Sequence, residues 1–175
     1  MHTYRNCAGI VLFNDEGKVL LGARADKKGR QWQFPQGGIE ENEKPEEAAL
    51  RELKEETSIT SANIILSLNE PISYTFPRPI REGLAAKGKM HIGQKMYWFL
   101  LHFTGDDREI NLATQNPEFK AYEWADIGMA PKRIIFFKKG VYLKVCRVFE
   151  PYIEAYIHRG ECLVGNIEDN NKKEA

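Results

Sequence analysis

GGIEENEKPEEAALRELKEETSI, residues 37–59, is the stretch of this 175-residue chain that decides its fold. Pro45 is favoured at the first position of a helix, and Glu46 and Glu47 in the first turn suit the positive end of the helix dipole. Ala49 and Leu53 would give this helix an apolar side. The sequence therefore predicts a helix over residues 45–57, preceded by an acidic loop and a Gly-Gly turn.

Three carboxylates share one side of the predicted helix, because Glu52, Glu55 and Glu56 are spaced i, i+3, i+4. Like charges repel each other, so their clustering needs an explanation. One interpretation is a solvated helix in which Arg51 forms ion pairs one turn away. The other is a divalent cation held by carboxylate oxygens and by a phosphate-bearing substrate. The preceding Gly-Gly favours the second, since glycine lets the backbone approach an anion closely.

The same stretch resembles the Nudix box, in which a glycine and a glutamate precede an Arg-Glu-hydrophobic-any-Glu-Glu-any-Gly-hydrophobic run. The matching residues are Gly37, Glu43, Arg51, Glu52, Leu53, Glu55, Glu56 and Ile59. Ser58 stands where the family has glycine. We interpret Ser58 as a small stability cost, because a left-handed residue that ends a helix is usually glycine.

A second stretch, Asn111 to Trp124 (NLATQNPEFKAYEW), resembles the branch of the family that contains bacterial RNA pyrophosphohydrolases and plant-type diadenosine tetraphosphate hydrolases. Further marks of this branch are WQFPQGG at residues 32–38, Gly93-Gln94-Lys95 and Phe137-Lys138. Thr75 and Tyr97 depart from its pattern, and we expect both near the substrate cleft.

The resemblance implies Mg²⁺-dependent hydrolysis of a phosphoanhydride, with Mn²⁺ as a substitute. Its implied catalytic residues are Arg51, Glu52, Glu55, Glu56 and Glu118. Its implied metal ligands are Gly37, Glu52, Glu55, Glu56 and Glu118, and its implied substrate-binding residues are Gly38, Glu43, Tyr74, Gln94, Phe137 and Lys138. Glu43 either reaches the site from the loop or pairs with Arg51. Sequence alone does not assign the general base.

Strands, an inserted helix, more strands and a closing helix predict an α/β protein with a mixed sheet between helices. This order agrees with the α/β/α sandwich that the resemblance implies. We expect one domain over residues 1–160 and a polar, disordered tail over 161–175. Pro77 to Gly93 reads as a long basic loop that could bind substrate or act as a lid. Gly140 to Ile157 reads as a helix that Pro151 kinks or splits.

Composition limits the partners. Lys+Arg and Asp+Glu are both 25, so no overall positive field attracts nucleic acid, which would have to be held locally. Three scattered cysteines argue against a disulfide framework, and no secretory signal or membrane span is present, so we expect a cytoplasmic protein without membrane contact or an obligate protein partner.

Three functions remain. The first is an RNA 5′-pyrophosphohydrolase acting on the 5′-triphosphate end of RNA. The second is a dinucleoside polyphosphate hydrolase. The third, a Nudix-fold binding module without catalysis, would lack box carboxylates, and none is missing.

Overall fold

A mixed sheet forms the centre of the computed structural model, which describes residues 3–26 and 31–171. Its strands are β1 Thr3–Phe13, β2 Val19–Arg24, β3 Trp32–Gln33, β4 Gln36–Gly38, β5 Ala62–Ser67, β6 Ile72–Thr75, β7 His91–Phe103 and β8 Phe119–Ala125. The helices are α1 Pro45–Thr57, α2 Arg78–Ala85, α3 Ala130–Arg133 and α4 Lys139–Asn171. Single 3₁₀ turns lie at Asp107–Glu109, Ile127–Met129 and Phe136–Lys138.

The long strands β1 and β7 run parallel at the middle of the sheet and pair from Thr3↔His91 to Phe13↔His102. The principal strand order is β3-β2-β1-β7-β5, while β4, β6 and β8 pair with β1, β7 and β2. β1 and β2 form the expected antiparallel hairpin. The sheet is therefore mixed, as the sequence predicts.

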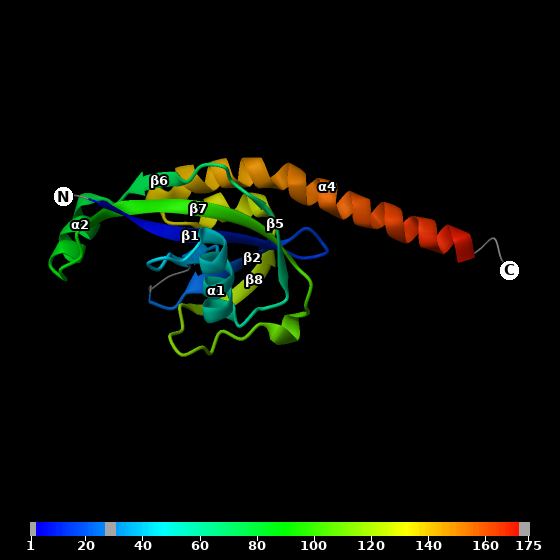
Figure 1. Cartoon of the computed structure of the whole chain (residues 1–175), viewed down its shortest axis with the longest axis horizontal. Coiled ribbons are helices and arrows are strands. Elements are labelled where there is room, and N and C mark those ends of the chain that lie inside the picture. Colours follow the sequence, from blue (N-terminus) through cyan, green and yellow to red (C-terminus); the bar gives the residue numbers. More distant parts are fainter. Residues whose placement is uncertain (1–2, 27–30, 172–175) are drawn as a thin grey trace.

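The two faces of β1 are both apolar, so both must be covered. Cys7, Val11 and Phe13 belong to a core that α4 completes, whereas Ala8, Ile10 and Leu12 belong to a second core that α1 completes. Because strand side chains alternate, one strand serves both cores. Figure 1 shows α1 and α4 on opposite sides of the sheet. The α/β/α sandwich is confirmed.

Helix α1 spans residues 45–57, as predicted. It ends because Ser58 takes the left-handed conformation, with φ of 66°, and its backbone N–H donates to the carbonyl of Lys54. The Ser58 hydroxyl donates to the carbonyl oxygen of Asn111 at 3.0 Å. Ser58 therefore does more than add strain: it joins the helix end to the loop that leads to Glu118.

Two expectations about irregular regions are wrong. The Pro77–Gly93 segment contains helix α2, which begins with Pro79 in its first turn, and its last residues belong to β7. Ile80 and Leu84 are spaced i, i+4 and give α2 an apolar side. Of the two effects expected of Pro151, the split is wrong, because Pro151 lies inside one continuous helix α4, and the kink stays a prediction. Its side of α4 is exposed, so water can bond the carbonyl that proline leaves unpaired.

The end of the chain also differs from the expectation. α4 continues to Asn171, so residues 161–171, expected in a disordered tail, are helical. Residues 172–175 lie outside the described part of the chain. The domain boundary at residue 160 stays a prediction. None of the helices in the described part combines the length and the apolarity that crossing a membrane requires.

Replacing Ser58 separates its strain from its hydrogen bond. A left-handed residue other than glycine costs about 1–2 kcal/mol, and a hydrogen bond contributes about 0.5–1.5 kcal/mol, so in Ser58→Gly the two effects nearly cancel. Ser58→Ala keeps the strain and loses the bond to Asn111. We expect its melting temperature to fall by about 2–4 °C, measured by circular dichroism, with little change for Ser58→Gly. An alanine variant as stable as wild type would contradict the assigned bond.

Candidate active site

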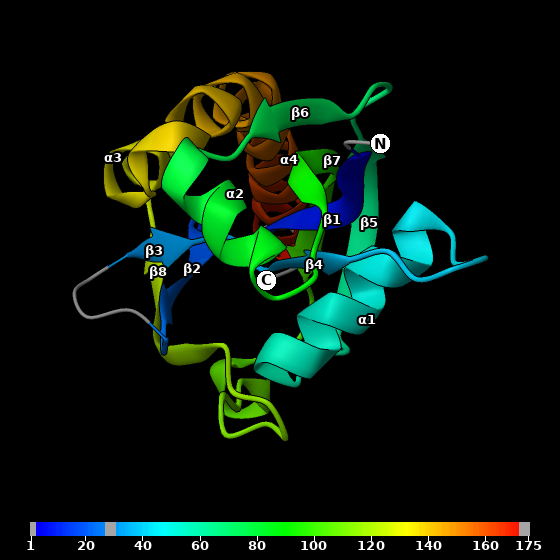
Figure 2. The same cartoon turned by 90° about the vertical axis from the view of Figure 1, so that its left-hand side faces the viewer.

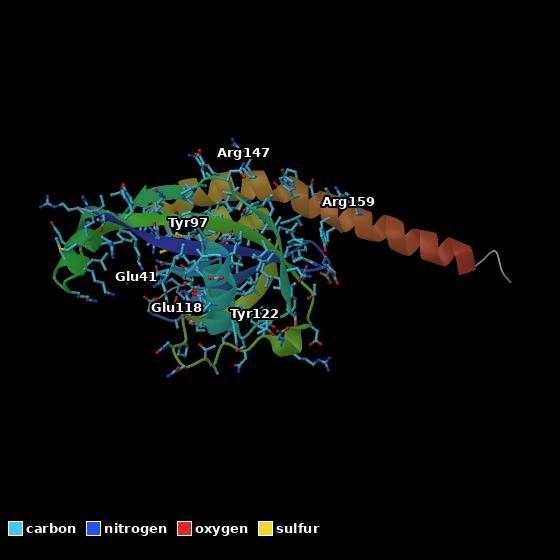
Figure 3. All side chains as sticks on the ribbon, viewed as in Figure 1. Glu41, Tyr97, Glu118, Tyr122, Arg147 and Arg159 are labelled. Carbon is cyan, nitrogen blue, oxygen red and sulfur yellow. The ribbon has the colours of Figure 1, made fainter. Side chains whose placement is uncertain are left out.

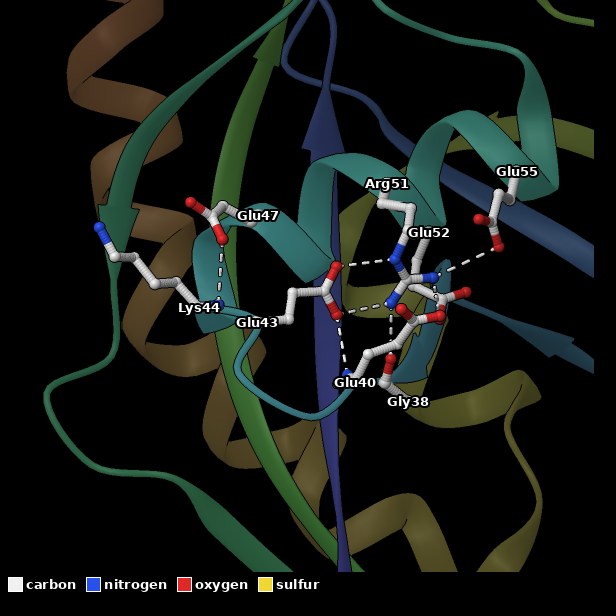
Figure 4. A network of polar contacts seen from close by, with 8 residues as sticks. All are labelled: Gly38, Glu40, Glu43, Lys44, Glu47, Arg51, Glu52 and Glu55. Carbon is white, nitrogen blue, oxygen red and sulfur yellow. Dashed lines mark hydrogen bonds and ion pairs between the residues drawn. The ribbon is translucent and has the colours of Figure 1, made fainter.

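Arg51, on α1, donates hydrogen bonds to the surrounding carboxylates from all three of its guanidinium nitrogens (Figure 4). Nε and Nη2 donate to the two carboxylate oxygens of Glu43 at 2.7 and 2.8 Å. Nη1 donates to Glu52 at 2.9 Å and to Glu55 at 3.3 Å. Nη2 also donates to the carbonyl oxygen of Gly38 at 2.8 Å. Arg51 therefore fixes α1 against the acidic loop and against β4.

Of the two roles expected for Glu43, the structure shows the pairing with Arg51. The hydrogen bond from Arg51 lowers the pKa of Glu43 to about 2, and the Glu40 N–H adds to this effect. The same bond raises the pKa of Arg51. Glu47 accepts from the Lys44 backbone N–H at 3.2 Å, which caps the helix start (Figure 4). Both members of the Arg51–Glu43 pair are thus charged at neutral pH.

Glu56 is the most unusual acid of the helix, because its side chain is buried. One carboxylate oxygen accepts the Gln36 backbone N–H at 3.1 Å, and the other is buried with no hydrogen-bond partner. Burial raises the pKa of Glu56 well above its usual range, and the charges of Glu118 and Glu52 raise it further. Burial also raises the pKa of Glu52, against the opposing hydrogen bond from Arg51. These carboxylates therefore lie close enough to repel one another.

We call the cavity between α1, β4 and the 111–118 loop the acid cleft. It has a volume of about 790 Å³ and brings Glu118, from the distant loop, opposite the helix carboxylates. Of the expected site residues its lining includes Gly38, Arg51, Glu52, Glu55 and Glu56, whereas Gly37 and Glu43 do not line it. Figure 3 shows Glu118 near the α1 side of the sheet. The backbone N–H of Ala25 donates to the Glu118 carbonyl and fixes the loop end.

A second cavity, of about 320 Å³, contains four more of the expected site residues, and we call it the aromatic cavity. Tyr74, Gln94, Phe137 and Lys138 all line it, and the Tyr74 hydroxyl donates to the Gln94 side chain. Burial lowers the pKa of Lys138 to about 8. The Lys138 ammonium lies 5.7 Å from the centre of the Tyr74 ring. The structure therefore brings together four predicted substrate-binding residues from three separate segments.

Gln36 joins the two cavities. Its backbone N–H bonds Glu56 of the acid cleft, and its side-chain oxygen accepts from Lys138 at 3.3 Å in the aromatic cavity. A molecule with an apolar ring and an anionic group could therefore lie across both. Thr75 and Tyr97, which we expected near the substrate cleft, line neither cavity, although Thr75 lies between Tyr74 and Phe76 of the aromatic cavity. Thr75 bonds the Tyr4 hydroxyl, and Tyr97 packs on the α1 side of the sheet.

Several polar residues of these cavities were missed by sequence reasoning, among them Arg5, Thr114 and Arg24. Arg5 lines the acid cleft, and a Cβ added at Gly38 would lie 2.1 Å from its guanidinium. Thr114 also lines the cleft, and its buried hydroxyl has no hydrogen-bond partner. Arg24 lines the aromatic cavity. A basic residue in the first strand was the available signal for Arg5, but nothing local in the sequence indicates that these side chains converge.

The donor set fits the divalent metal that the Nudix resemblance implies. The unpartnered oxygen of Glu56 and the neighbouring carboxylates are the hard ligands that Mg²⁺ prefers. The backbone of Gly37 passes against Glu52, since an added Cβ would lie 1.9 Å from its carboxyl carbon. Within the described residues, no three His, Cys, Asp or Glu side chains are yet gathered closely enough to hold a metal. Arg51 draws Glu52 and Glu55 to itself.

A Nudix domain model matches residues 3–145, so the chain belongs to the Nudix family. It is 40% identical over 154 residues to the RNA pyrophosphohydrolase of Sphingopyxis alaskensis, covering 86% of this chain and 95% of that protein. It is 41% identical to the chloroplastic Nudix hydrolase 26 of Arabidopsis thaliana, over 86% of this chain and 71% of that one.

Among solved structures, the dihydroneopterin triphosphate pyrophosphohydrolase of E. coli has the same fold. The TM-score is 0.59 at 23% identity, covering 81% of this chain and 96% of that chain.

Glu56→Gln should stabilise the metal-free protein at alkaline pH. Because the pKa of Glu56 is raised on folding, the folded state binds the extra proton, and stability falls as pH rises above about 4.5. Glutamine keeps an acceptor for Gln36 without the charge. In EDTA at about pH 8, we expect its melting temperature to exceed that of wild type by at least about 2 °C. The difference should vanish near pH 4, and equal melting temperatures at both pH values would contradict the assignment.

Proposed function

We propose that this chain hydrolyses the 5′-triphosphate end of RNA and releases pyrophosphate. The observation that carries the proposal is that Gln36, which lines the aromatic cavity, bonds both Lys138 of that cavity and Glu56 of the acid cleft, so the two cavities are neighbours. The cleft suits a metal-bound polyphosphate, and the cavity suits a base stacked on Tyr74 and Phe137. The 40% sequence identity to the RNA pyrophosphohydrolase of Sphingopyxis alaskensis, over 95% of that protein, supports the choice of RNA.

Glu52, Glu55, Glu56 and Glu118 would hold Mg²⁺, with the backbone of Gly37 beside them. When bound, Mg²⁺ would neutralise the carboxylates, acidify a water molecule and balance the charge of the phosphates. Arg51 orients Glu52 and Glu55 and keeps Gly38 in place. Glu43 would act on substrate binding through Arg51, because it does not line the cleft.

In the proposed reaction, water attacks one phosphorus of the anhydride, and the bridging oxygen leaves with the other phosphate. The water's proton passes to a carboxylate of the cleft, where Glu52, Glu56 and Glu118 lie together. Lys138 and Arg5, one in each cavity, would balance negative charge on the substrate. The buried Lys138 is still mostly protonated near pH 7, because burial lowers its pKa only to about 8.

A dinucleoside polyphosphate hydrolase is the second candidate. The aromatic cavity, with its two stacking rings and the Gln94 amide, is equally suited to the base of such a molecule. We also propose a reducing, cytoplasmic location, which the free buried thiols of Cys7 and Cys146 support.

Two substrates separate the candidates. With Mg²⁺, purified protein should release pyrophosphate from 5′-triphosphorylated RNA with a higher kcat/KM than it shows for diadenosine tetraphosphate. Pyrophosphate release and nucleotide products are measured by chromatography. Rapid turnover of the dinucleotide without pyrophosphate release from RNA would favour the second candidate. Absence of both reactions would indicate a binding module.

Removing single carboxylates should abolish most of the activity while the fold persists. Loss of a catalytic acid or base typically costs about 100- to 10,000-fold in rate. We expect Glu56→Gln and Glu118→Gln to fall in this range, with melting temperatures no lower than about 2 °C below wild type. Glu41→Gln is the matched control, because Glu41 is an exposed acid of the loop before α1 that does not line the cleft. Unchanged rates in both cleft variants would overturn the site.

A further inference from the structure

A third cavity lies between α2 and the start of β7, and we call it the α2 groove. Its volume is about 290 Å³, near the lower end of the range of ligand pockets, about 300–1,000 Å³. Ala85, Met90 and Ile92 give it an apolar floor. Its remaining lining residues are Arg78, Arg81, Glu82, Lys89 and His91. Such a slot could accept one flat ring with a charged group at its rim.

Positive charge at this groove is mostly uncompensated. Arg78 is paired with Glu82 at 2.7 Å, but both side chains are largely exposed. Within the described residues, no ion pair involves Arg81, Lys87 or Lys89, and all three are exposed. The whole chain has no net charge, so this is a local basic surface. Exposed unpaired cations are the groups that bind a nucleic-acid backbone.

Helix α2 separates the α2 groove from the aromatic cavity. Ile80 and Leu84, on one side of the helix, line the aromatic cavity. Arg78, Arg81 and Ala85, on the other side, line the groove. Figure 2 shows α2 between the α3 side and the β4–α1 side of the molecule, and Figure 1 places it at the end of the sheet opposite the projecting part of α4.

Three cavities thus follow in a fixed order. Gln36 lies between the acid cleft and the aromatic cavity, since it bonds a residue of each, and α2 lies between the aromatic cavity and the α2 groove. With a polyphosphate in the acid cleft and the 5′-terminal nucleoside in the aromatic cavity, the rest of an RNA chain would continue beside the α2 groove. A dinucleoside polyphosphate has no strand that continues from its nucleoside. The groove therefore distinguishes the two substrate classes.

We propose that the α2 groove binds an RNA nucleotide downstream of the 5′-terminal one. Its base rests on the apolar floor, and Arg81 and Lys89 contact the backbone phosphates. This inference rests on the proposed function. It assigns recognition of the RNA beyond its first nucleotide to a surface outside the acid cleft. Base stacking and phosphate contacts of this kind tolerate any sequence, so the groove recognises a strand and not a particular base.

Reversing the two charges tests the groove. For Arg81→Glu/Lys89→Glu, we expect kcat/KM on a single-stranded triphosphorylated RNA of about ten nucleotides to fall at least about 10-fold, mainly through KM. Turnover of diadenosine tetraphosphate should stay within about 2-fold of wild type, because that molecule does not reach the groove. Loss of two phosphate contacts should also flatten the salt dependence of RNA binding, by about 1.4 in log–log slope.

The matched control reverses two exposed cations of α4, in Lys144→Glu/Arg147→Glu (Arg147 is labelled in Figure 3). It makes the same change in net charge and should leave RNA turnover near wild type. Equal losses in the groove variant and the control, or equal losses on RNA and on the dinucleotide, would overturn the proposal.

Binding of RNA with a 5′-hydroxyl end, measured by fluorescence anisotropy, tests the groove without catalysis. Weaker binding by the groove variant supports it even if wild type releases no pyrophosphate, in which case the proposed function alone fails. Unchanged binding, with wild-type turnover of RNA intact, overturns the groove alone.

Discussion

The arrangement of the site depends on one problem in electrostatics, the close packing of carboxylates on α1. Glu56 is nearly fully buried and has an unpartnered oxygen, and Glu52 and Glu118 raise its pKa further. Arg51 offsets only part of this repulsion, because its donors face Glu43, Glu52 and Glu55. The rest of the fold offsets the remaining unfavourable free energy of this repulsion. Two apolar cores, one on each face of the β1–β7 pair, supply the stability that allows it.

Local patterns predicted the regular parts of the fold well. α1 agrees with its prediction because Pro45, the first-turn acids and the apolar side of the helix all favour the same boundaries. The parallel pairing of β1 and β7 was beyond such reasoning, since two strands far apart in sequence carry no local sign of being neighbours. α2 was missed because its sequence is basic, Pro77 and Pro79 lie at its start, and Gly83 lies within it. Ile80 and Leu84 were the only periodic signal, and their packing partners come from elsewhere in the chain.

The sequence predicted which carboxylates belong to the candidate site, but not how the fold brings them and the other cavity residues together. A family pattern indicated the carboxylates, and the structure places Glu118 opposite them from a loop that Ser58 helps to hold. Arg5, Arg24 and Thr114 were not foreseen, because each becomes a cavity residue only through tertiary packing. The side of the sheet on which Tyr97 lies also follows from tertiary structure. Alternation along β7 turns it towards the α1 core, while Gln94, three residues earlier, faces the aromatic cavity.

In this arrangement, the residues proposed to carry out the reaction and the residues proposed to select the substrate lie on different structural elements. The groups proposed to act on the anhydride belong to α1 and the 111–118 loop, where burial and like charge make the metal-free site costly in free energy. Groups that would hold the rest of a substrate belong to the aromatic cavity and α2, which share no ion pair with α1 among the described residues. Changes in α2 can therefore alter substrate choice without disturbing the Arg51 network. On this basis, two Nudix proteins with the same residues in the Nudix box can differ in substrate. The box would then set the reaction, and the residues of the aromatic cavity and α2 would set which substrate is cleaved.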